Sequence, residues 1–405
     1  MVLLTAMARI VSLDVLRGFA LLGILLLNIV SFGLPFAAYL NPTVAGGATG
    51  ANLTVWYLAT IFWDGKMRAI FSMLFAASFD AFLAGLPEAD RAKLYYRRTL
   101  WLIVFGLLHA HLLWSGDILY PYGVIGLLLY FFRQWPARKL IWTGAAILVL
   151  HSLWNLGGSF MMRDMQQRGG EEWAQIERLF APSPQVVEEQ IRTHRAGYLA
   201  SLAMRSRDAY EFEGPLFFQY IFLDVLGMFV LGLGLARAGL FDASRSARLY
   251  AVMAVAGVAL GLPLNYWAAA QWHAAEFGIP AYFAYIASTQ DPGRLLVAAG
   301  YIGIVMLLVQ ANVRWFVQPL ANVGRMALSN YLLTSLLMTL FFDGIGLGQF
   351  ARWERAELYL VVLGMWVINL TWSPLWLRYF RYGPAEWVWR SLTYWRLQPL
   401  RRTGG

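Results

Sequence analysis

A histidine and an aspartate near the end of one apolar stretch are the best candidates for chemistry in this 405-residue sequence. His109 and Asp117 are eight residues apart and share a face if the helix continues, whereas His109 and His111 point to different faces. A carboxylate that orients a histidine makes a general base for a hydroxyl or amine group. The two histidines are poorly placed to share a metal ion, so no metal site is expected. The alternative is that His109 only forms a hydrogen bond between helices.

Four other polar side chains lie within apolar stretches, where each ionisable group costs roughly 2.5 to 3.5 kcal/mol unless it is paired or functional. Asp14 and Arg17 are three residues apart and close enough to pair with each other. Asn28 either bonds another helix or lines a cavity. Asp224 needs a cationic partner, for which Lys66, Arg68 and Arg325 are available. If Asp14, Asn28 and Asp224 line one midplane site, they suit a transporter.

The composition indicates that membrane helices hold these residues. The chain is 59% hydrophobic and only 14% charged, which excludes the soluble, fibrous and disordered classes of protein. It has no cysteine, so disulfides and thiolate metal sites are excluded. The net charge of +9 is interpreted as Lys and Arg gathered in cytoplasmic loops beside anionic lipids, and no nucleic-acid partner is expected.

Ten apolar stretches are close to the roughly 20 residues that cross the hydrocarbon core of a membrane. They are residues 13–34, 67–86, 95–114, 118–132, 140–161, 216–235, 249–269, 295–311, 320–342 and 358–380. The second adjoins another apolar segment, because residues 53–63 are also apolar and polar residues 64–68 follow them, which indicates one long or broken helix.

The charges of the loops predict the orientation of these spans. Lys and Arg gather in alternate loops, whereas residues 35–52 and 115–117 have none and residues 271–294 have one at the end. Since positive loops stay in the cytoplasm, the N- and C-termini are both predicted to be cytoplasmic. The sequence therefore predicts an all-α polytopic transmembrane helical bundle, with residues 1–405 forming a single membrane domain.

Two polar segments accompany the bundle. Residues 163–214 mix acidic and basic side chains with helix-forming residues, and they are predicted to form an extracytoplasmic helical insertion that acts as a lid. The alternative is a plain solvated connector. In residues 383–405, tryptophans and tyrosine alternate with arginines, which is typical of an amphipathic cytoplasmic helix at the headgroups.

Several blocks of the sequence resemble one family of bacterial membrane proteins. The opening SLDVLRGFA at residues 12–20 looks like the signature of the YeiB-like proteins, the "domain of unknown function 418" family. Residues 101–119, residues 324–331 (GRMALSNY) and residues 380–394 (FRYGPAEWVWRSLTY) also resemble family blocks. The resemblance covers nearly the whole chain and implies a multi-pass protein of the bacterial cytoplasmic (inner) membrane.

The resemblance also implies an activity. The Leu-Asp-x-x-Arg-Gly opening is similar to that of transmembrane acyltransferases, including the lysosomal enzyme that acetylates heparan glucosamine. Such enzymes move an acyl group from cytosolic acyl-CoA, here acetyl-CoA, to a sugar or lipid acceptor. By this resemblance Arg17, Arg98 and Arg325 surround the acyl donor, and His109 and Asp117 act as base and orienting group. Asn330, within the block at 324–331, is an expected substrate contact.

Two function classes therefore stand at this point. The first is an acyl-CoA-dependent membrane acyltransferase, in which the donor must reach His109 from the cytoplasmic side. The second is a secondary transporter or lipid translocator that uses Asp14, Asn28 and Asp224. The expected partners are membrane lipids and a small-molecule, sugar or lipid acceptor, and the sequence leaves open whether the chain forms homo-oligomers.

Overall fold

The computed structural model describes residues 11–402, which are helical almost throughout. Among these residues, seven helices or continuous helical runs are long and apolar enough to cross a membrane. They are α1 (Val11–Gly33), the run Gly50–Ala84, α7 (Ala137–Arg168), the run Phe217–Arg237, α12 (Ala247–Ala274), the run Ile279–Gln310 and α17 (Leu358–Tyr379). The chain is therefore an all-α polytopic membrane protein, as predicted.

The predicted span at residues 320–342 is not one continuous helix. It consists of α15 (Arg314–Arg325) and α16 (Ala327–Phe342), which meet at an angle of 80° and would make an eighth crossing if counted together. The Glu386 carboxylate accepts hydrogen bonds from the backbone amides of Leu328 and Ser329. Because these amides belong to the first turn of α16, the carboxylate caps α16 as a separate helix.

Two further predicted spans lie on helices that fall outside this count. α5 (Arg91–Leu112) carries four basic residues in its first two turns, Arg91, Lys93, Arg97 and Arg98. α6 (Leu119–Leu129) continues into η3 (Tyr130–Phe132) and is a short apolar helix. The total of ten membrane crossings stays a prediction.

The second span is a broken helix, one of the two forms predicted for it. α3 (Gly50–Leu58) passes into a π-helical turn, η1 (Ala59–Trp63), and α4 (Lys66–Ala84) begins after a break. Gly65, at this break, has a φ of 71°, a left-handed conformation that glycine adopts without steric cost. The apolar residues before the break thus belong to the same run as those after it.

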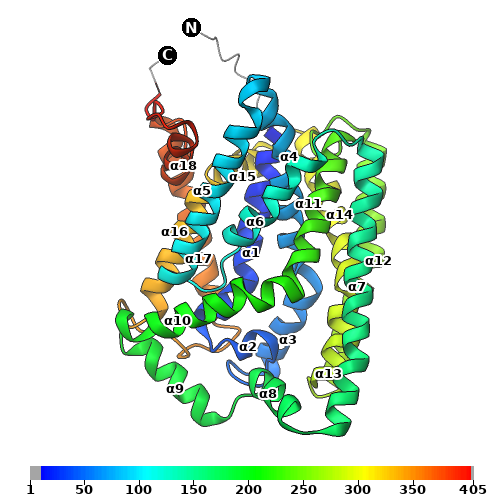
Figure 1. The fold of residues 1–405 in the computed structure, drawn as a ribbon, viewed down its shortest axis with the longest axis vertical. Helices are drawn as coiled ribbons and strands as arrows, with labels where there is room; N and C mark the ends of the chain where they lie inside the picture. Colours follow the sequence, from blue (N-terminus) through cyan, green and yellow to red (C-terminus); the bar gives the residue numbers. More distant parts are fainter. Residues whose placement is uncertain (1–10, 403–405) are drawn as a thin grey trace.

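Two elements outside the spans lie at opposite ends of the molecule. The helices α8 to α10 of the insertion lie at the bottom of Figure 1, and α18 lies at the top, near the start of α5. The insertion begins with the end of α7, which continues to Arg168. The remaining helices are α2 (Ala37–Leu40), η2 (Glu88–Asp90), α8 (Glu171–Phe180), α9 (Pro184–Arg195), α10 (Tyr198–Glu213), η4 (Phe217–Ile221), α11 (Phe222–Arg237), α13 (Ile279–Ala281), η5 (Tyr282–Ala287), α14 (Ser288–Gln310) and α18 (Pro384–Tyr394).

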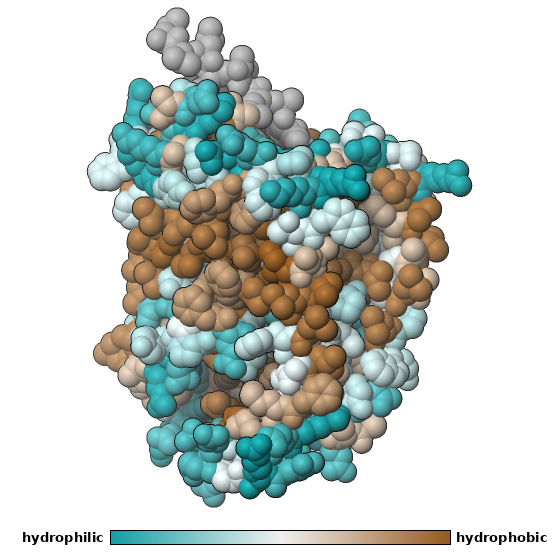
Figure 2. All heavy atoms as spheres, turned by 45° about the vertical axis from the view of Figure 1, so that its right-hand side comes forward, coloured by the Kyte–Doolittle hydropathy of each residue, from teal (hydrophilic) through white to brown (hydrophobic). Residues whose placement is uncertain are grey.

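The surface has the polarity that a bilayer requires. Figure 2 shows apolar side chains in a band across the molecule, with hydrophilic residues gathered at the two ends. Large apolar side chains on α7, α12 and α17 are well exposed, among them Trp142, Val255 and Val367. Such a face is stable in lipid, where apolar exposure carries no cost.

Glycines let the helices approach one another closely at two places. A Cβ atom on Gly18 would overlap the backbone carbonyl of Leu320, and one on Gly324 would overlap that of Asp14, so α1 and α15 touch backbone to backbone. Gly257 of α12 lies equally close to the backbone of α14. Small residues at such contacts are the usual basis of close helix packing in membranes.

Candidate functional site

His109 and Asp117 form a buried pair. The Nδ1 atom of His109 lies 2.7 Å from Oδ1 of Asp117, and each side chain is 1% exposed. α5 ends at Leu112, so the helix does not continue to Asp117, and the turn that follows brings the Asp117 side chain to His109 instead. An ionised carboxylate only accepts hydrogen bonds, so Nδ1 carries the proton and Nε2 presents its lone pair. Nε2 is buried and has no hydrogen-bond partner among the described residues.

Further hydrogen bonds fix the carboxylate of Asp117. The Tyr331 hydroxyl of α16 donates to Oδ1 at 3.2 Å, and the Tyr120 amide donates to Oδ2 at 2.7 Å. The Ile118 amide donates in turn to the Tyr331 hydroxyl at 3.3 Å. The ring of Tyr331 also lies against that of His109, with centroids 4.9 Å apart. Asp117 therefore joins α5, the start of α6 and α16.

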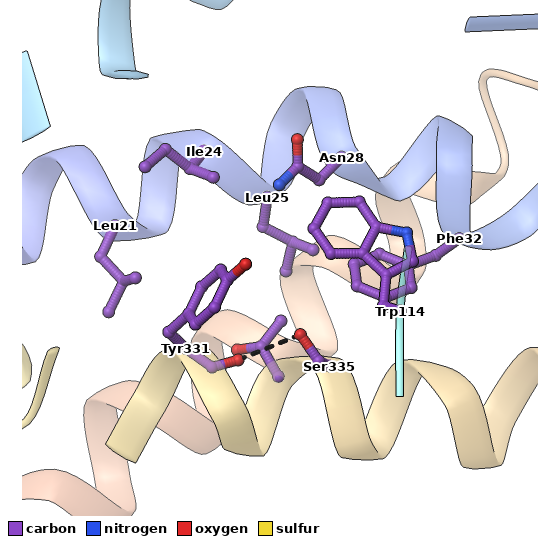
Figure 3. A pocket seen from close by; sticks show the side chains of 9 residues that line it. Leu21, Ile24, Leu25, Asn28, Phe32, Trp114, Tyr331 and Ser335 are labelled. Carbon is purple, nitrogen blue, oxygen red and sulfur yellow. Dashed lines mark hydrogen bonds between the residues drawn. The ribbon is translucent and has the colours of Figure 1, made fainter. Parts of the chain in front are cut away.

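A narrow hollow lies beside this pair; it measures about 270 Å³ with the open space at its mouth, but its enclosed part has room for only about one water molecule. Figure 3 shows α1 on one side of it and α16 on the other. It is lined by Leu21, Ile24, Leu25, Asn28, Phe32, Trp114, Tyr331, Thr334 and Ser335. Trp114 and Tyr331 both contact the His109 ring, so His109 lies directly behind the wall of the hollow. Asn28 lines a cavity, one of its two predicted roles.

Three of the predicted donor and substrate residues lie one or more helical turns from the hollow, toward the end of the bundle that carries α18. They are Asp14, Arg17 and Arg325. Arg17 pairs with Asp14 at 3.1 Å and donates to the Ser78 hydroxyl at 2.5 Å. The contact between Gly324 and the Asp14 carbonyl places Arg325 next to the same turn of α1. The hollow begins one turn deeper, at Leu21. These residues therefore lie near one end of the hollow and do not line it.

Arg98 and Asn330 have structural contacts away from the hollow. The guanidinium of Arg98 lies 4.0 Å from the ring centroid of Trp389 and 4.6 Å from that of Phe82. Asn330 is fully buried and accepts a hydrogen bond from the Trp372 indole at 2.6 Å. Its amide nitrogen donates to the carbonyl of Val323 and to the hydroxyl of Ser373. Asn330 holds α15, α16 and α17 together.

Asp224 belongs to a separate buried cluster. It accepts a hydrogen bond from Arg68 at 2.5 Å and another from Arg294. Arg68 was among the predicted partners and Arg294 was not, while Lys66 donates instead to the Thr60 carbonyl. Asp14, Asn28 and Asp224 therefore have different partners, and they do not line one common transport site.

This cluster contains a second histidine–aspartate pair, which was not predicted from the sequence. His151 of α7 lies 2.6 Å from Asp291 of α14, and Ser152 donates to the same carboxylate. Asp291 also accepts a hydrogen bond from Arg294, three residues further along α14. His151 was a detectable signal, because it interrupts an apolar stretch. Asp291 and Arg294 were assigned to a loop, but they lie within a buried helix.

Hydrogen bonds connect the insertion, residues 163–214, to the membrane-spanning helices. Asp343, after α16, accepts hydrogen bonds from Arg205 at 2.6 Å and from His194 at 3.0 Å. Arg205 and Tyr198 also donate to the Leu112 carbonyl at the end of α5. α10 therefore covers the end of the helix that carries His109.

These features define a polytopic helical membrane protein with a buried histidine–carboxylate pair beside an interhelical hollow. Residues 235–396 match the family model described as "Protein of unknown function (DUF418)". The chain is 34% identical over 395 residues to "Uncharacterized protein YeiB" of Escherichia coli (strain K12), covering 96% of this chain and 97% of that protein. It is 27% identical over 417 residues to "Uncharacterized protein YxaH" of Bacillus subtilis (strain 168), covering 97% and 96%. The chain belongs to the YeiB-like DUF418 family, as its blocks predicted.

Proposed function

We propose that this protein is a bacterial inner-membrane acyltransferase that moves an acyl group from cytosolic acyl-CoA to a sugar or lipid acceptor. The observation that carries the proposal is the buried His109–Asp117 pair, with Nε2 of His109 unpartnered next to the hollow. A neutral histidine oriented by a buried carboxylate is the arrangement that general-base catalysis uses. Acetyl-CoA is the proposed donor.

In the proposed reaction, Nε2 of His109 takes the proton from a hydroxyl or amine of the acceptor. The acceptor oxygen or nitrogen forms a bond to the thioester carbonyl carbon, and the bond from that carbon to sulfur breaks. The CoA thiolate leaves and receives the proton from His109. Asp117 stabilises the imidazolium that exists between the two proton transfers, because its carboxylate stays hydrogen-bonded to Nδ1.

The path of the donor follows α1. Arg17 and Arg325 lie at the proposed cytoplasmic end, where guanidinium groups suit the phosphates of CoA. The hollow continues along the same helix from Leu21 to Phe32 with a mostly apolar lining, and it must widen between α1 and α16 before an extended thioester arm can enter. Since Trp114 and Tyr331 separate the hollow from His109, the reaction requires the side chain of Trp114 to move aside.

The test is transfer of label from radioactive acetyl-CoA to bacterial lipids and glycans by the purified protein in lipid nanodiscs. Transfer by the wild-type protein that disappears in His109→Gln supports the proposal. His111→Gln is the matched control, because His111 contacts Glu213 on a different face of α5. Equal transfer by wild type and His109→Gln would remove His109 from the mechanism, and no protein-dependent transfer to any acceptor would reject the activity.

A further inference from the structure

The break in the second span leaves the start of a helix inside the protein. α4 begins at Lys66, directly after Gly65, and Lys66 is only 2% exposed. The first amides of a helix carry a partial positive charge, which attracts anions. Gly65 has no side chain that could cover this helix start. The helix start lies inside the 35-residue apolar run Gly50–Ala84 and not at an end of it.

Arg294 gives independent evidence for a ligand at the start of α4. A methyl group on Gly65 would lie 3.3 Å from Cδ of Arg294, so the Arg294 side chain runs over the start of α4. Arg294 is 1% exposed, and one of its nitrogens, Nη2, binds both Asp224 and Asp291. Its Nε and Nη1 atoms are buried and have no partner within residues 11–402. Buried donors of this kind are rarely left unsatisfied.

The three cations around the break, Lys66, Arg68 and Arg294, face three carboxylates, so the unsatisfied edge of Arg294 rather than a surplus of positive charge points to an anion. Arg68 and Arg294 are balanced by Asp224 and Asp291, with which they form ion pairs. Lys66 is the third buried cation, and it donates to the Thr60 carbonyl. Its opposite charge is the carboxylate of Asp64, two residues before it, which lies beyond ion-pair distance. The Nε and Nη1 edge of a guanidinium is the fork that binds phosphate and carboxylate oxygens in pairs.

We propose that the start of α4, Arg294 and Lys66 form an interior binding site for an oxyanion of the phosphate class. The guanidinium fork of Arg294 binds two oxygens, and the Lys66 ammonium and the first amides of α4 neutralise the charge. The side chain of Arg68 is 32% exposed, so the cluster is open on that side. The anion is either free inorganic phosphate or the phosphate group of a membrane lipid. This site is independent of the proposed acyl transfer, which uses α1, α5 and α16.

The experiment measures binding of radioactive inorganic phosphate to the full-length protein in nanodiscs. One set of discs contains only phosphatidylcholine, and the other also contains phosphatidylglycerol. Saturable phosphate binding in both sets identifies free phosphate as the ligand. Two results together identify the lipid phosphate as the ligand. Inorganic phosphate then binds only in the discs of pure phosphatidylcholine, and the protein retains phosphatidylglycerol after delipidation. No saturable binding and no retained anionic lipid would mean that water fills the site, and the proposal would be overturned.

Two variants locate the bound anion. Arg294→Lys keeps a cation for Asp224 and Asp291 but removes the fork, and Lys66→Gln removes a cation that has no carboxylate within ion-pair distance, Asp64 being the one that faces it. Each is expected to weaken binding at least about tenfold, as loss of a charge-assisted hydrogen bond does. Arg237→Lys and Lys139→Gln are the matched controls, because Arg237 pairs with Asp80 and Lys139 stacks on Trp135 elsewhere. Wild-type affinity in Lys66→Gln or in a folded Arg294→Lys protein would contradict the proposed site.

Discussion

His109 and Tyr331 bind the same oxygen atom of Asp117, at 2.7 and 3.2 Å, although they come from helices more than 200 residues apart in the sequence. The orientation of the histidine therefore depends on the position of α16 as well as on its own helix. Changes in α16 are expected to act on His109 through this shared carboxylate.

Replacing His109 is the most direct test of the proposed chemistry. We expect His109→Gln to lower acyl transfer by about 10²- to 10⁴-fold, the usual contribution of a general base, with little change in the apparent affinity for acetyl-CoA. Asp117→Asn is expected to lower the rate as well, because an amide no longer selects the Nδ1-protonated form of His109. The measurement is the initial rate of label transfer; a rate that falls equally in His111→Gln would point to misfolding instead.

The contact between α1 and α15 predicts a large effect for a very small substitution. In Gly18→Ala, the added methyl group would overlap the carbonyl of Leu320, so the helices must separate. We expect a loss of about 1 to 3 kcal/mol, as in other overpacked contacts, seen as a lower unfolding temperature in detergent. Gly364→Ala in α17 is the matched control, because no atom lies within 4 Å of the position of its added methyl group. Equal unfolding temperatures for the two variants would refute the close contact.

Glu386 should control the start of α16 from outside the bundle. Its carboxylate accepts hydrogen bonds from the Leu328 and Ser329 amides at 2.7 and 3.1 Å, and burial raises its pKa. We expect Glu386→Gln to cost about 1 kcal/mol of stability, the typical value of a helix cap, and to slow transfer because α16 carries Tyr331. The exposed Glu188→Gln is the control, and hydrogen exchange of residues 327–331 is the measurement. Unchanged exchange in Glu386→Gln would contradict the capping role.

The insertion should loosen as the pH rises. Burial, with help from Glu211, raises the pKa of Asp208 in α10 to about 6, whereas an ordinary Asp titrates at about 3.9. Since the folded state favours the protonated form, the stabilising contribution of Asp208 is complete below about pH 4 and is lost as the pH rises through 6.

Asp208→Asn keeps this side chain neutral at every pH. At about pH 7 the variant should therefore protect α10 from hydrogen exchange better than the wild type does, and near pH 4 the two proteins should match. The nearby cations Arg205 and Arg207 favour the charged form of Asp208 in the wild type, but burial outweighs them, so the pKa is raised on balance. Equal protection of α10 at both pH values would show that Asp208 does not govern the insertion.

The sequence predicted the main elements because apolar length and loop charge are local properties. The span 358–380 agrees with α17 to within one residue, and the broken second span follows from the polar residues after Trp63. The bend at Met326 was missed, since the carboxylate that caps α16 there belongs to Glu386, 58 residues from the amide of Leu328.

The candidate site was predicted in part, and for a partly mistaken reason. His109 and Asp117 were paired on the assumption of a continuing helix, but a turn after Leu112 joins them. Tyr331 was not singled out, because its role depends on a contact between helices that are distant in the sequence. His151 and Asp291 are 140 residues apart, and no local spacing links them. Partners within one helix can be read from sequence, whereas partners across the bundle depend on tertiary packing.

The docking of α18 has a consequence for biosynthesis. The Trp389 indole donates to the backbone carbonyl of Arg98 across 291 residues, and Glu386 caps α16 from the same helix. Both residues leave the ribosome after every predicted span has been made. The face that holds the starts of α5 and α16 is therefore completed only after the last predicted span has been synthesised, and the earlier spans must remain in the bilayer until then without this contact.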